Sequence, residues 1–304
     1  DKVRKLVEAD KVHVVFGPLY AHSAIAVAEY VGKRGIPNIY YAPFSMDPIR
    51  LGGGFVFMPG GTMKGVTYYL GRYCYEKLGY RTVSALHLDM VFGADSVGGL
   101  LEGFTECGGT VLQDQPVPMG TMDFAPYLAA VKPADFVAYC LIPTDVPAFT
   151  TQYHAYGLKM PLVYTAVCPP SYEILQELGD LALGLVSESD YNCDIDTDMN
   201  RRFVDAWMEK YGTYPVWWQT WGYATTTFFI EAVKATGGDT TPEKIVEALH
   251  KVRVETPSGY QSFDSEGLGA RDLYILKVVK EGDRYVWKII DTYEQITAIA
   301  PSER

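Results

Sequence analysis

The sequence predicts an α/β fold made of two lobes, and three observations support this. Short apolar runs such as residues 12–16 alternate with stretches of helical periodicity such as residues 21–34, which is typical of strands buried on both faces of a parallel sheet. The alternation restarts after a glycine-rich stretch at residues 52–61. The 304 residues also exceed one ordinary small domain and suffice for two separate hydrophobic cores.

The first block, residues 1 to about 60, contains two clear strands, at residues 12–16 and 38–41. Two parallel strands do not form a stable sheet by themselves. We therefore expect residues from about 190 to 260, or chain preceding residue 1, or both, to complete this sheet. Because the sequence opens on a helix directly before a strand, we also expect an N-terminal strand–helix–strand to be absent from it.

The second block repeats a helix followed by a strand. Helices are expected at residues 63–78, 92–107, 124–131 and 146–156, and strands after them at residues 82–88, 110–117, 136–140 and 162–164. A further strand is expected at residues 182–187, and helices at residues 202–211, 220–236 and 242–252. Alternating polarity on both sides of Gly282 and Asp283 predicts an antiparallel hairpin made by residues 273–281 and 285–292.

The composition excludes several classes of function. Lys and Arg number 26 against 37 Asp and Glu, a net charge of −11, and no basic run is present, so nucleic acid is not an expected partner. No apolar stretch approaches the roughly 18 residues of a membrane-spanning helix. The five cysteines include no CxxC pair, which excludes zinc-ribbon and thioredoxin-like sites. Aromatic residues make up 13% of the chain and cluster at residues 214–218, which favours either large cores or a pocket lined by rings.

Motif searches give no catalytic, metal or cofactor site. No GxGxxG follows a strand, no phosphate-binding GxxxxGK[ST] occurs, and no histidine pair has metal-ligand spacing. Residues 194–199 imitate the start of a calcium loop, but Met199 stands where glycine is required, so we interpret them as an acidic loop that caps a helix. His87 with Asp89 is the one acid–base pair that a cleft hydrolase could use. The simpler interpretation is a strand residue and a loop cap.

The carboxyl ends of the strands are where open α/β sheets bind ligands. One loop there, residues 17–23, leads directly into a helix, whose free backbone N–H groups and positive dipole end could bind a carboxylate without Lys or Arg. His22 and Ser23 would add side-chain donors. Ser23 could equally serve only as a helix cap, and His22 only as a surface residue.

Several segments together resemble one family. They are residues 12–18, 35–43, 89–93, 124–128 and 259–267. In order and spacing these segments resemble the type I periplasmic solute-binding proteins of ABC transporters, in the branched-chain amino-acid (leucine/isoleucine/valine-binding-like) family. The resemblance covers essentially all 304 residues, without the family's first strand–helix–strand. It implies two Rossmann-like lobes of the Venus-flytrap kind, joined by a three-segment hinge that closes on a ligand.

The resemblance also implies lobe boundaries and a function. Lobe 1 would take residues 1–60 and 189–260, and lobe 2 residues 61–188 and 261–304. The protein would be an extracytoplasmic solute-binding component of an importer, not an enzyme, without cofactor or metal. Its partners would be a small-molecule ligand and an ABC permease with its ATPase. We expect a monomer, located in the periplasm or outside the cell, with a lipid anchor in the precursor as one option.

Family positions, strand-end loops and nearby rings give the candidate ligand-binding residues. They are Tyr20, Ala21, His22, Ser23, Ala42, Phe44, Ser45, Phe92, Ile142, Thr165, Ala166, Tyr191 and Trp217. By the resemblance, residues 21–23 would meet the ligand carboxylate and Phe92 would supply a ring from lobe 2.

One departure from the family concerns the ligand. Amino-acid binders of the family carry a carboxylate in the loop after the strand at residues 162–164, where it pairs with the ligand's α-ammonium, but residues 165–168 here contain none. An ammonium buried without a partner costs several kcal/mol. The sequence therefore favours an aromatic or other apolar acid without an ammonium group. The alternatives are an amino acid paired with Asp89, Glu188 or Asp190, a ligand-sensing domain of a receptor or regulator, and a hydrolase.

Overall fold

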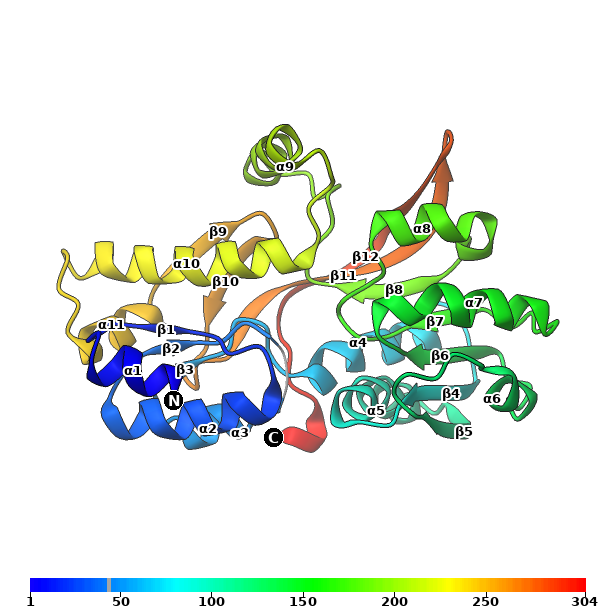
Figure 1. The fold of residues 1–304 in the computed structure, drawn as a ribbon, viewed down its shortest axis with the longest axis horizontal. Helices are drawn as coiled ribbons and strands as arrows, with labels where there is room; N and C mark the ends of the chain where they lie inside the picture. The colour runs from blue at the N-terminus through cyan, green and yellow to red at the C-terminus, as the bar shows by residue number, and fades with distance from the viewer. Residues whose placement is uncertain (43–44) are drawn as a thin grey trace. The chain divides into compact units, whose positions relative to one another are not determined.

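The computed structural model describes residues 1–42 and 45–304 and shows an α/β chain that forms two compact units (Figure 1). Unit 1 consists of Asp1–Thr62, Ile195–Asp272 and Glu294–Arg304. Unit 2 consists of Met63–Asp194 and Leu273–Tyr293. Each unit contains both strands and helices, as the two-lobed prediction required.

Unit 1 begins with a small parallel sheet in the order β1-β2-β3. Its strands are β1 (Val15–Phe16), β2 (Asn38–Ile39) and β3 (Val56–Phe57), and its first helices are α1 (Lys2–Glu8), α2 (Ala21–Arg34) and α3 (Asp47–Leu51). The prediction of only two strands in this block was wrong. The third strand was missed because the apolar run that contains it, residues 55–58, is only four residues long between glycines and a proline, too short to show periodicity.

Residues 195–272 complete unit 1 as a compact unit. They form α9 (Asp198–Tyr211), α10 (Trp217–Ala235), α11 (Pro242–Leu249), β9 (Arg253–Thr256), β10 (Gly259–Phe263) and the start of β11 (Gly269–Glu281). Strands β9 and β10 pair in a larger sheet and do not extend the three-stranded one, so the expectation that these residues complete that sheet was wrong. Phe228 and Ile245 share one buried core with Ile39 and Phe57 of the first block. Thr197 caps α9 by accepting a hydrogen bond from the Asn200 N–H at 3.1 Å, in agreement with the interpretation of residues 194–199.

Unit 2 contains most of a larger sheet in the order β5-β4-β6-β7-β8-β11-β10-β9, of which β10 and β9 belong to unit 1. Its parallel strands are β4 (Thr82–Leu88), β5 (Thr110–Val117), β6 (Phe136–Cys140), β7 (Leu162–Tyr164) and β8 (Val186–Ser189). The helices between them are α4 (Met63–Glu76), α5 (Val91–Glu106), α6 (Ala125–Ala129), α7 (Val146–Ala155) and α8 (Tyr172–Leu178). β11 pairs antiparallel with β8, and β12 (Arg284–Thr297) pairs with β11, which confirms the predicted terminal hairpin.

The division into units differs from the predicted lobes in the last third of the chain. Residues 261–272 and 294–304 were assigned to lobe 2 but belong to unit 1. β10 pairs with β9 in unit 1, and Met58 forms a parallel bridge with Leu268. Thr62 donates its backbone N–H to the Ala298 carbonyl at 2.7 Å. The tail therefore returns to unit 1, a fourth crossing that neither periodicity nor the resemblance indicated.

Candidate functional site

The carboxyl edge of the sheet in unit 1 brings together two of the predicted ligand loops. β1 and β2 are parallel neighbours, so the chain that leaves each of them lies at the same edge. Buried Asn38 fixes the first loop, because its side-chain amide donates to the carbonyls of Val15 at 2.9 Å and Gly17 at 2.8 Å. Gly17 has a φ of +84°, a conformation that favours glycine.

The first loop ends at the start of α2. Tyr20 is the N-cap, in an extended conformation, and its side chain does not cap the helix by a hydrogen bond. The helix start thus lacks the usual cap from its N-cap residue, a feature that the carboxylate hypothesis favours. Tyr20 is 67% exposed and Ser23 is half-buried. The side chains of Ala21 and His22, and all of Phe44, lie outside the described residues, so their predicted roles stay predictions.

An aromatic cluster lies at the same edge, formed by Tyr41, Trp217, Trp218 and Trp221. Tyr41 is the second residue after β2 and stacks on Trp221, with 5.3 Å between ring centroids. Trp217 lies 4.8 Å from Trp221 and 3.8 Å from Trp218 by the same measure. Trp218 is 46% exposed while the other three rings are buried. The cluster contains one predicted site residue, Trp217, and adjoins a second, the buried Ala42.

Buried polar side chains support this cluster from within unit 1. The Tyr41 hydroxyl donates to Gln261 Oε1 at 3.3 Å and accepts from Gln261 Nε2 at 3.2 Å. The guanidinium of Arg271 lies 5.9 Å from the Tyr41 ring and donates to the Pro59 carbonyl at 2.8 Å. Arg271 is only 1% exposed. Sequence reasoning missed Arg271 and Gln261, since both lie in strands of alternating polarity whose partners periodicity does not identify.

The carboxyl edge of unit 2 carries the other predicted residues. β4, β6, β7 and β8 are parallel neighbours, so the residues that follow them share one edge of the sheet. These residues are Phe92, Ile142, Thr165, Ala166 and Tyr191. Thr165, Ala166 and Tyr191 are buried, Phe92 is half-buried and Ile142 is 36% exposed. Their contact with a ligand stays a prediction.

Glu188 on β8 holds the turn that follows β7. Its Oε1 accepts hydrogen bonds from the backbone N–H groups of Ala166 at 3.0 Å and Val167 at 2.9 Å, and from the Thr165 hydroxyl at 3.4 Å. The side chain is wholly buried, and this burial raises the pKa of Glu188 to about 8, against the lowering effect of these hydrogen bonds. A carboxyl group thus does reach the loop that contains none in sequence. Asp190 is also buried, whereas Asp89 is exposed.

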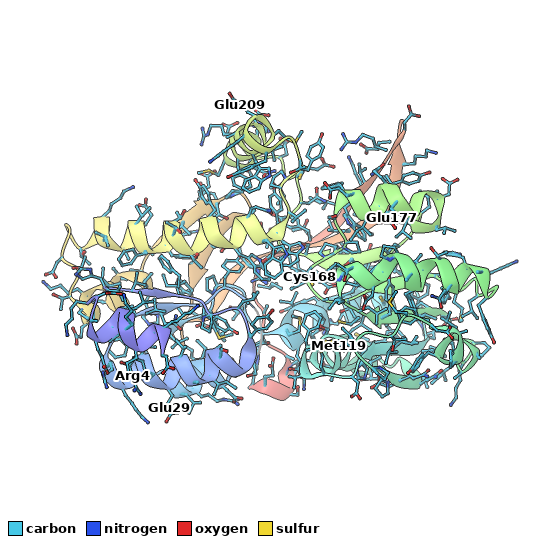
Figure 2. All side chains as sticks on the ribbon, in the orientation of Figure 1. Arg4, Glu29, Met119, Cys168, Glu177 and Glu209 are labelled. Carbon is cyan, nitrogen blue, oxygen red and sulfur yellow. The ribbon has the colours of Figure 1, made fainter. Side chains whose placement is uncertain are left out.

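The geometry does not support the acid–base pair of His87 and Asp89 that the hydrolase hypothesis requires. His87 Nε2 lies 3.4 Å from Asp114 Oδ1 on β5, and Nδ1 lies 2.8 Å from the Leu88 carbonyl, so both ring nitrogens face groups other than the Asp89 carboxyl. The described residues hold no group of three or more His, Cys, Asp or Glu able to bind a metal ion. All five cysteines are free thiols, among them buried Cys168, which follows Val167 and is labelled in Figure 2.

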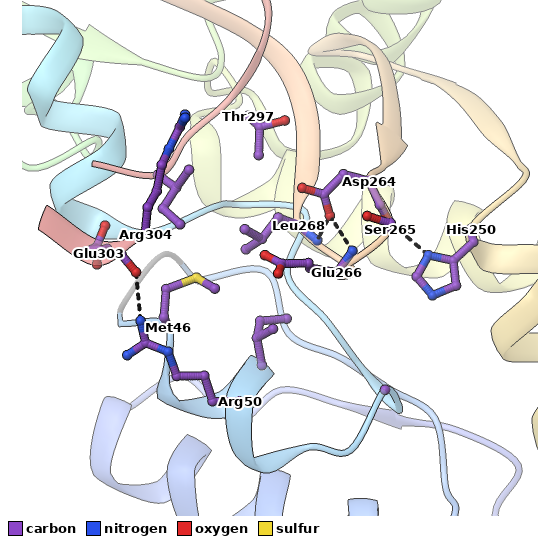
Figure 3. A pocket seen from close by; sticks show the side chains of 13 residues that line it. Met46, Arg50, His250, Asp264, Ser265, Glu266, Leu268, Thr297, Glu303 and Arg304 are labelled. Carbon is purple, nitrogen blue, oxygen red and sulfur yellow. Dashed lines mark hydrogen bonds between the residues drawn. The ribbon is translucent and has the colours of Figure 1, made fainter. Parts of the chain in front are cut away.

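A separate pocket of about 820 Å³ lies within unit 1 (Figure 3). Arg50, His250 and the C-terminal segment line it, and the Arg50 guanidinium donates to the Glu303 carbonyl at 2.7 Å. His250 Nδ1 lies 2.9 Å from the Asp264 carbonyl. Among the described residues that line this pocket, none is a predicted ligand-binding residue. The pocket therefore has no part in the site proposed from the sequence.

Comparison with known proteins agrees with this architecture. Residues 1–283 match the profile of the family described as periplasmic binding protein, so the chain belongs to that family. Within it, the chain is a type I solute-binding protein of ABC transporters, of the branched-chain amino-acid group, as the resemblance predicted. Among the described residues, none of the helices has both the length and the apolar character needed to cross a bilayer.

Three relatives illustrate the similarity. The Leu/Ile/Val-binding protein homolog 6 of Brucella suis is 24% identical over 96% of this chain and 77% of its own length. An ABC transporter substrate-binding protein from Sphaerobacter thermophilus is 27% identical, with a TM-score of 0.90 over 98% of this chain and 84% of that one. A solute-binding protein from Rhodopseudomonas palustris BisB5, solved with 3,4-dihydroxybenzoic acid, is 24% identical, with a TM-score of 0.85 over 99% and 83%.

Proposed function

We propose that this chain captures a small aromatic or other apolar carboxylic acid outside the cytoplasm and delivers it to an ABC permease driven by its ATPase. The observation that carries the proposal is the carboxyl edge of unit 1. There, a helix start without a side-chain cap lies at the same sheet edge as the cluster of Tyr41, Trp217, Trp218 and Trp221.

The two features suit the two parts of such a ligand. The first-turn N–H groups of α2, which the N-cap side chain does not cap, and the helix dipole favour a carboxylate. Aromatic side chains offer a ligand ring stacking and edge contacts of about 0.5–1.5 kcal/mol each beyond the apolar area they bury. Solved relatives of the same fold carry 3,4-dihydroxybenzoic acid, 4-hydroxybenzoate and benzoate. These are fold-level similarities, and they support the ligand class by analogy only.

A branched-chain amino acid is the second candidate ligand. The buried carboxyl of Glu188, in contact with the turn at residues 165–167, favours it, because a carboxylate there could pair with an α-ammonium. The Brucella relatives carry the name Leu/Ile/Val-binding protein homolog, and another structure of this fold holds isoleucine.

Isothermal titration calorimetry with benzoate, 4-hydroxybenzoate and leucine distinguishes the candidates. We expect both aromatic acids to bind and leucine to give no heat. Replacing Trp217 with leucine should weaken benzoate binding about tenfold, because the ring cluster at the edge is lost. The control is Trp207→Phe, since Trp207 stacks on Tyr211 in α9, outside the cluster. Binding of leucine without any benzoate binding would refute the proposed ligand class.

We also propose that the protein acts as a monomer in the periplasm, with a lipid anchor in the precursor. Light scattering behind a sizing column should give a mass near 33.8 kDa for this chain, with and without ligand. A stable dimer would contradict the monomer. Metabolic labelling of the native precursor with a palmitate analogue tests for the anchor.

A further inference from the structure

We propose that Glu188 is a positioning residue of the ligand-binding edge in unit 2: it fixes the turn at residues 165–167, and the turn changes its hydrogen bonding when the Glu188 carboxyl ionises. The inference deepens the proposed function and rests on it only for the link to ligand affinity. Its first basis is the set of three donors, two backbone N–H groups and one hydroxyl, that converge on a single carboxyl oxygen.

The backbone of the turn requires such support. Val167 has a φ of +58°, in the left-handed region that β-branched residues rarely adopt. Strained conformations of this kind persist only where surrounding structure holds them, and they concentrate at functional sites. The Val167 N–H donates to Glu188 at 2.9 Å, so the carboxyl restrains the strained residue directly. A loop without a strained backbone would not need a buried carboxyl group to hold its conformation.

The second carboxyl oxygen indicates why ionisation matters. Oε2 of Glu188 is buried and has no hydrogen-bond partner among the described residues. A neutral carboxyl matches this geometry, with Oε1 accepting as a carbonyl oxygen. An ionised one would place a charge on an oxygen that accepts no hydrogen bond from the described residues, while making Oε1 a stronger acceptor for the turn. The two protonation states therefore differ in how they hold residues 165–167.

Three buried thiols are among the titratable groups around Glu188, and they do not change charge near neutral pH. Cys74 from α4, Cys140 from β6 and Cys168 after β7 interact electrostatically with Glu188, and burial raises the pKa of each thiol, that of Cys140 to about 12. These thiols stay neutral where Glu188 titrates. On the strand beside β8, Ile275 pairs with Glu188 and brings no charge. Asp190 lies near Cys168 and is the acid whose influence must be separated from that of Glu188.

The affinity for a ligand should also change when Glu188 ionises, and the charge of the ligand decides whether the affinity falls or rises. Thr165 and Ala166 are proposed ligand contacts, and their turn becomes more negative when Glu188 ionises. A benzoate, which carries only negative charge, should then lose affinity above about pH 8, whereas an α-ammonium would gain it. At pH 7 the neutral carboxyl favours acids that lack an ammonium group.

The decisive experiment follows the amide protons of Ala166 and Val167 by NMR, with the full chain labelled on alanine and valine nitrogen and no ligand present. In the wild-type chain both signals should move downfield together as pH rises from 6 to 9, because an ionised carboxyl is the stronger acceptor. In Glu188→Gln, which keeps an acceptor oxygen and cannot ionise, the movement should vanish. It should persist in Asp190→Asn and in Glu177→Gln, an exposed acid on α8 labelled in Figure 2. The signals are assigned with Ala166→Gly and Val167→Gly.

Amide signals that do not titrate in the wild-type chain, or that titrate equally in Glu188→Gln, would overturn the proposal. Calorimetry with benzoate adds the functional readout. Wild-type affinity should fall several-fold between pH 7 and 9, Glu188→Gln should match the wild type at pH 6 without this fall, and Glu188→Ala should bind about tenfold more weakly at every pH. A purely structural role would lower the melting temperature of Glu188→Ala and leave its affinity unchanged. If benzoate fails to bind the wild-type chain at any pH, the proposed ligand class fails, and the amide titration still decides the role of Glu188.

Discussion

At the scale of single residues, the molecule buries polar groups where their partners are provided. Asn38, Gln261 and Glu188 are each buried inside one unit. The side chain of each forms a hydrogen bond with a residue in a strand or just after one. Removing the hydrogen-bond partner of such a buried group lowers the free energy of unfolding by about 1–3 kcal/mol. Glu188 differs from the other two because it can change charge. Its burial therefore links the stability of unit 2 to pH.

The sign of that linkage follows from the raised pKa of Glu188, about 8 in the folded chain against an ordinary value of 4.5. Folding favours the protonated form, so the stabilisation is complete below pH 4.5 and is lost as pH rises through 8. The group should lower the free energy of unfolding by up to about 5 kcal/mol across this range. Thermal melting at pH 5, 7 and 8.5 tests this.

In this series Glu188→Gln should lose much less stability between pH 5 and 8.5 than the wild-type chain, because the amide has no proton to release. Glu177→Gln, at an exposed position, should follow the wild type. Parallel losses in the wild type and in Glu188→Gln would show that other groups set the pH dependence.

At the scale of elements, the two helices α4 and α5 of unit 2 pack closely through glycines. A Cβ at Gly103 would lie 2.1 Å from the Tyr68 carbonyl oxygen, and one at Gly71 would lie 1.9 Å from that of Leu100. Real Cβ atoms do not approach backbone oxygens so closely, so the backbones touch where side chains would normally separate them. Glycine is a weak helix former, so the sequence pattern gives no reason for these glycines within helices. The close packing of α4 against α5 explains why they stand there.

Gly103→Ala should therefore force α4 and α5 apart and destabilise unit 2 by about 1–3 kcal/mol or more. Gly98→Ala, in the same helix, is the matched control, since its Cβ would meet only the Lys64 side chain at 3.9 Å. That substitution should be neutral or stabilise by up to about 1 kcal/mol through helix propensity. Denaturant unfolding of both variants checks the pair, and equal effects would contradict the packing argument.

At the scale of the whole molecule, sequence patterns predicted unit 2 better than unit 1. β6 and β7 are continuous apolar runs and β4 is a mostly apolar one, each between helices, so the local sequence pattern marks them. β1 and β3 have two residues each, and their sheet depends on contacts with residues about 200 positions later, such as Phe228. The local pattern of apolar and polar residues does not predict such long-range contacts. The same limit applies to the site, because Glu188 reaches the turn at residues 165–167 only through the register of β8 on β7.

The chain crosses between the units several times, which leads to a last prediction about which chain segments unit 2 needs in order to fold. Residues 273–293 belong to unit 2, although 78 residues of unit 1, 195–272, separate them from its other segment. They cover the edge of β8, with Tyr274 paired to Ser189. Trp287 also ties them to the body of unit 2, since its indole N–H donates to the Pro170 carbonyl at 2.8 Å and its carbonyl accepts from the Asn192 amide at 3.0 Å.

A protein made of residues 63–194 joined to residues 273–293 by a flexible glycine–serine linker should therefore fold alone, with a cooperative melting transition and dispersed amide signals. Residues 63–194 by themselves should not, because β8 would leave an unpaired strand edge and the buried apolar side chains of Leu273, Ile275 and Leu276 would be lost. Cooperative folding of the shorter fragment, or failure of the joined one, would show that the return of the chain is not what completes unit 2. The joined protein would also test Glu188 apart from unit 1, since the hydrogen bonds to its carboxyl from residues 165–167 all lie within unit 2.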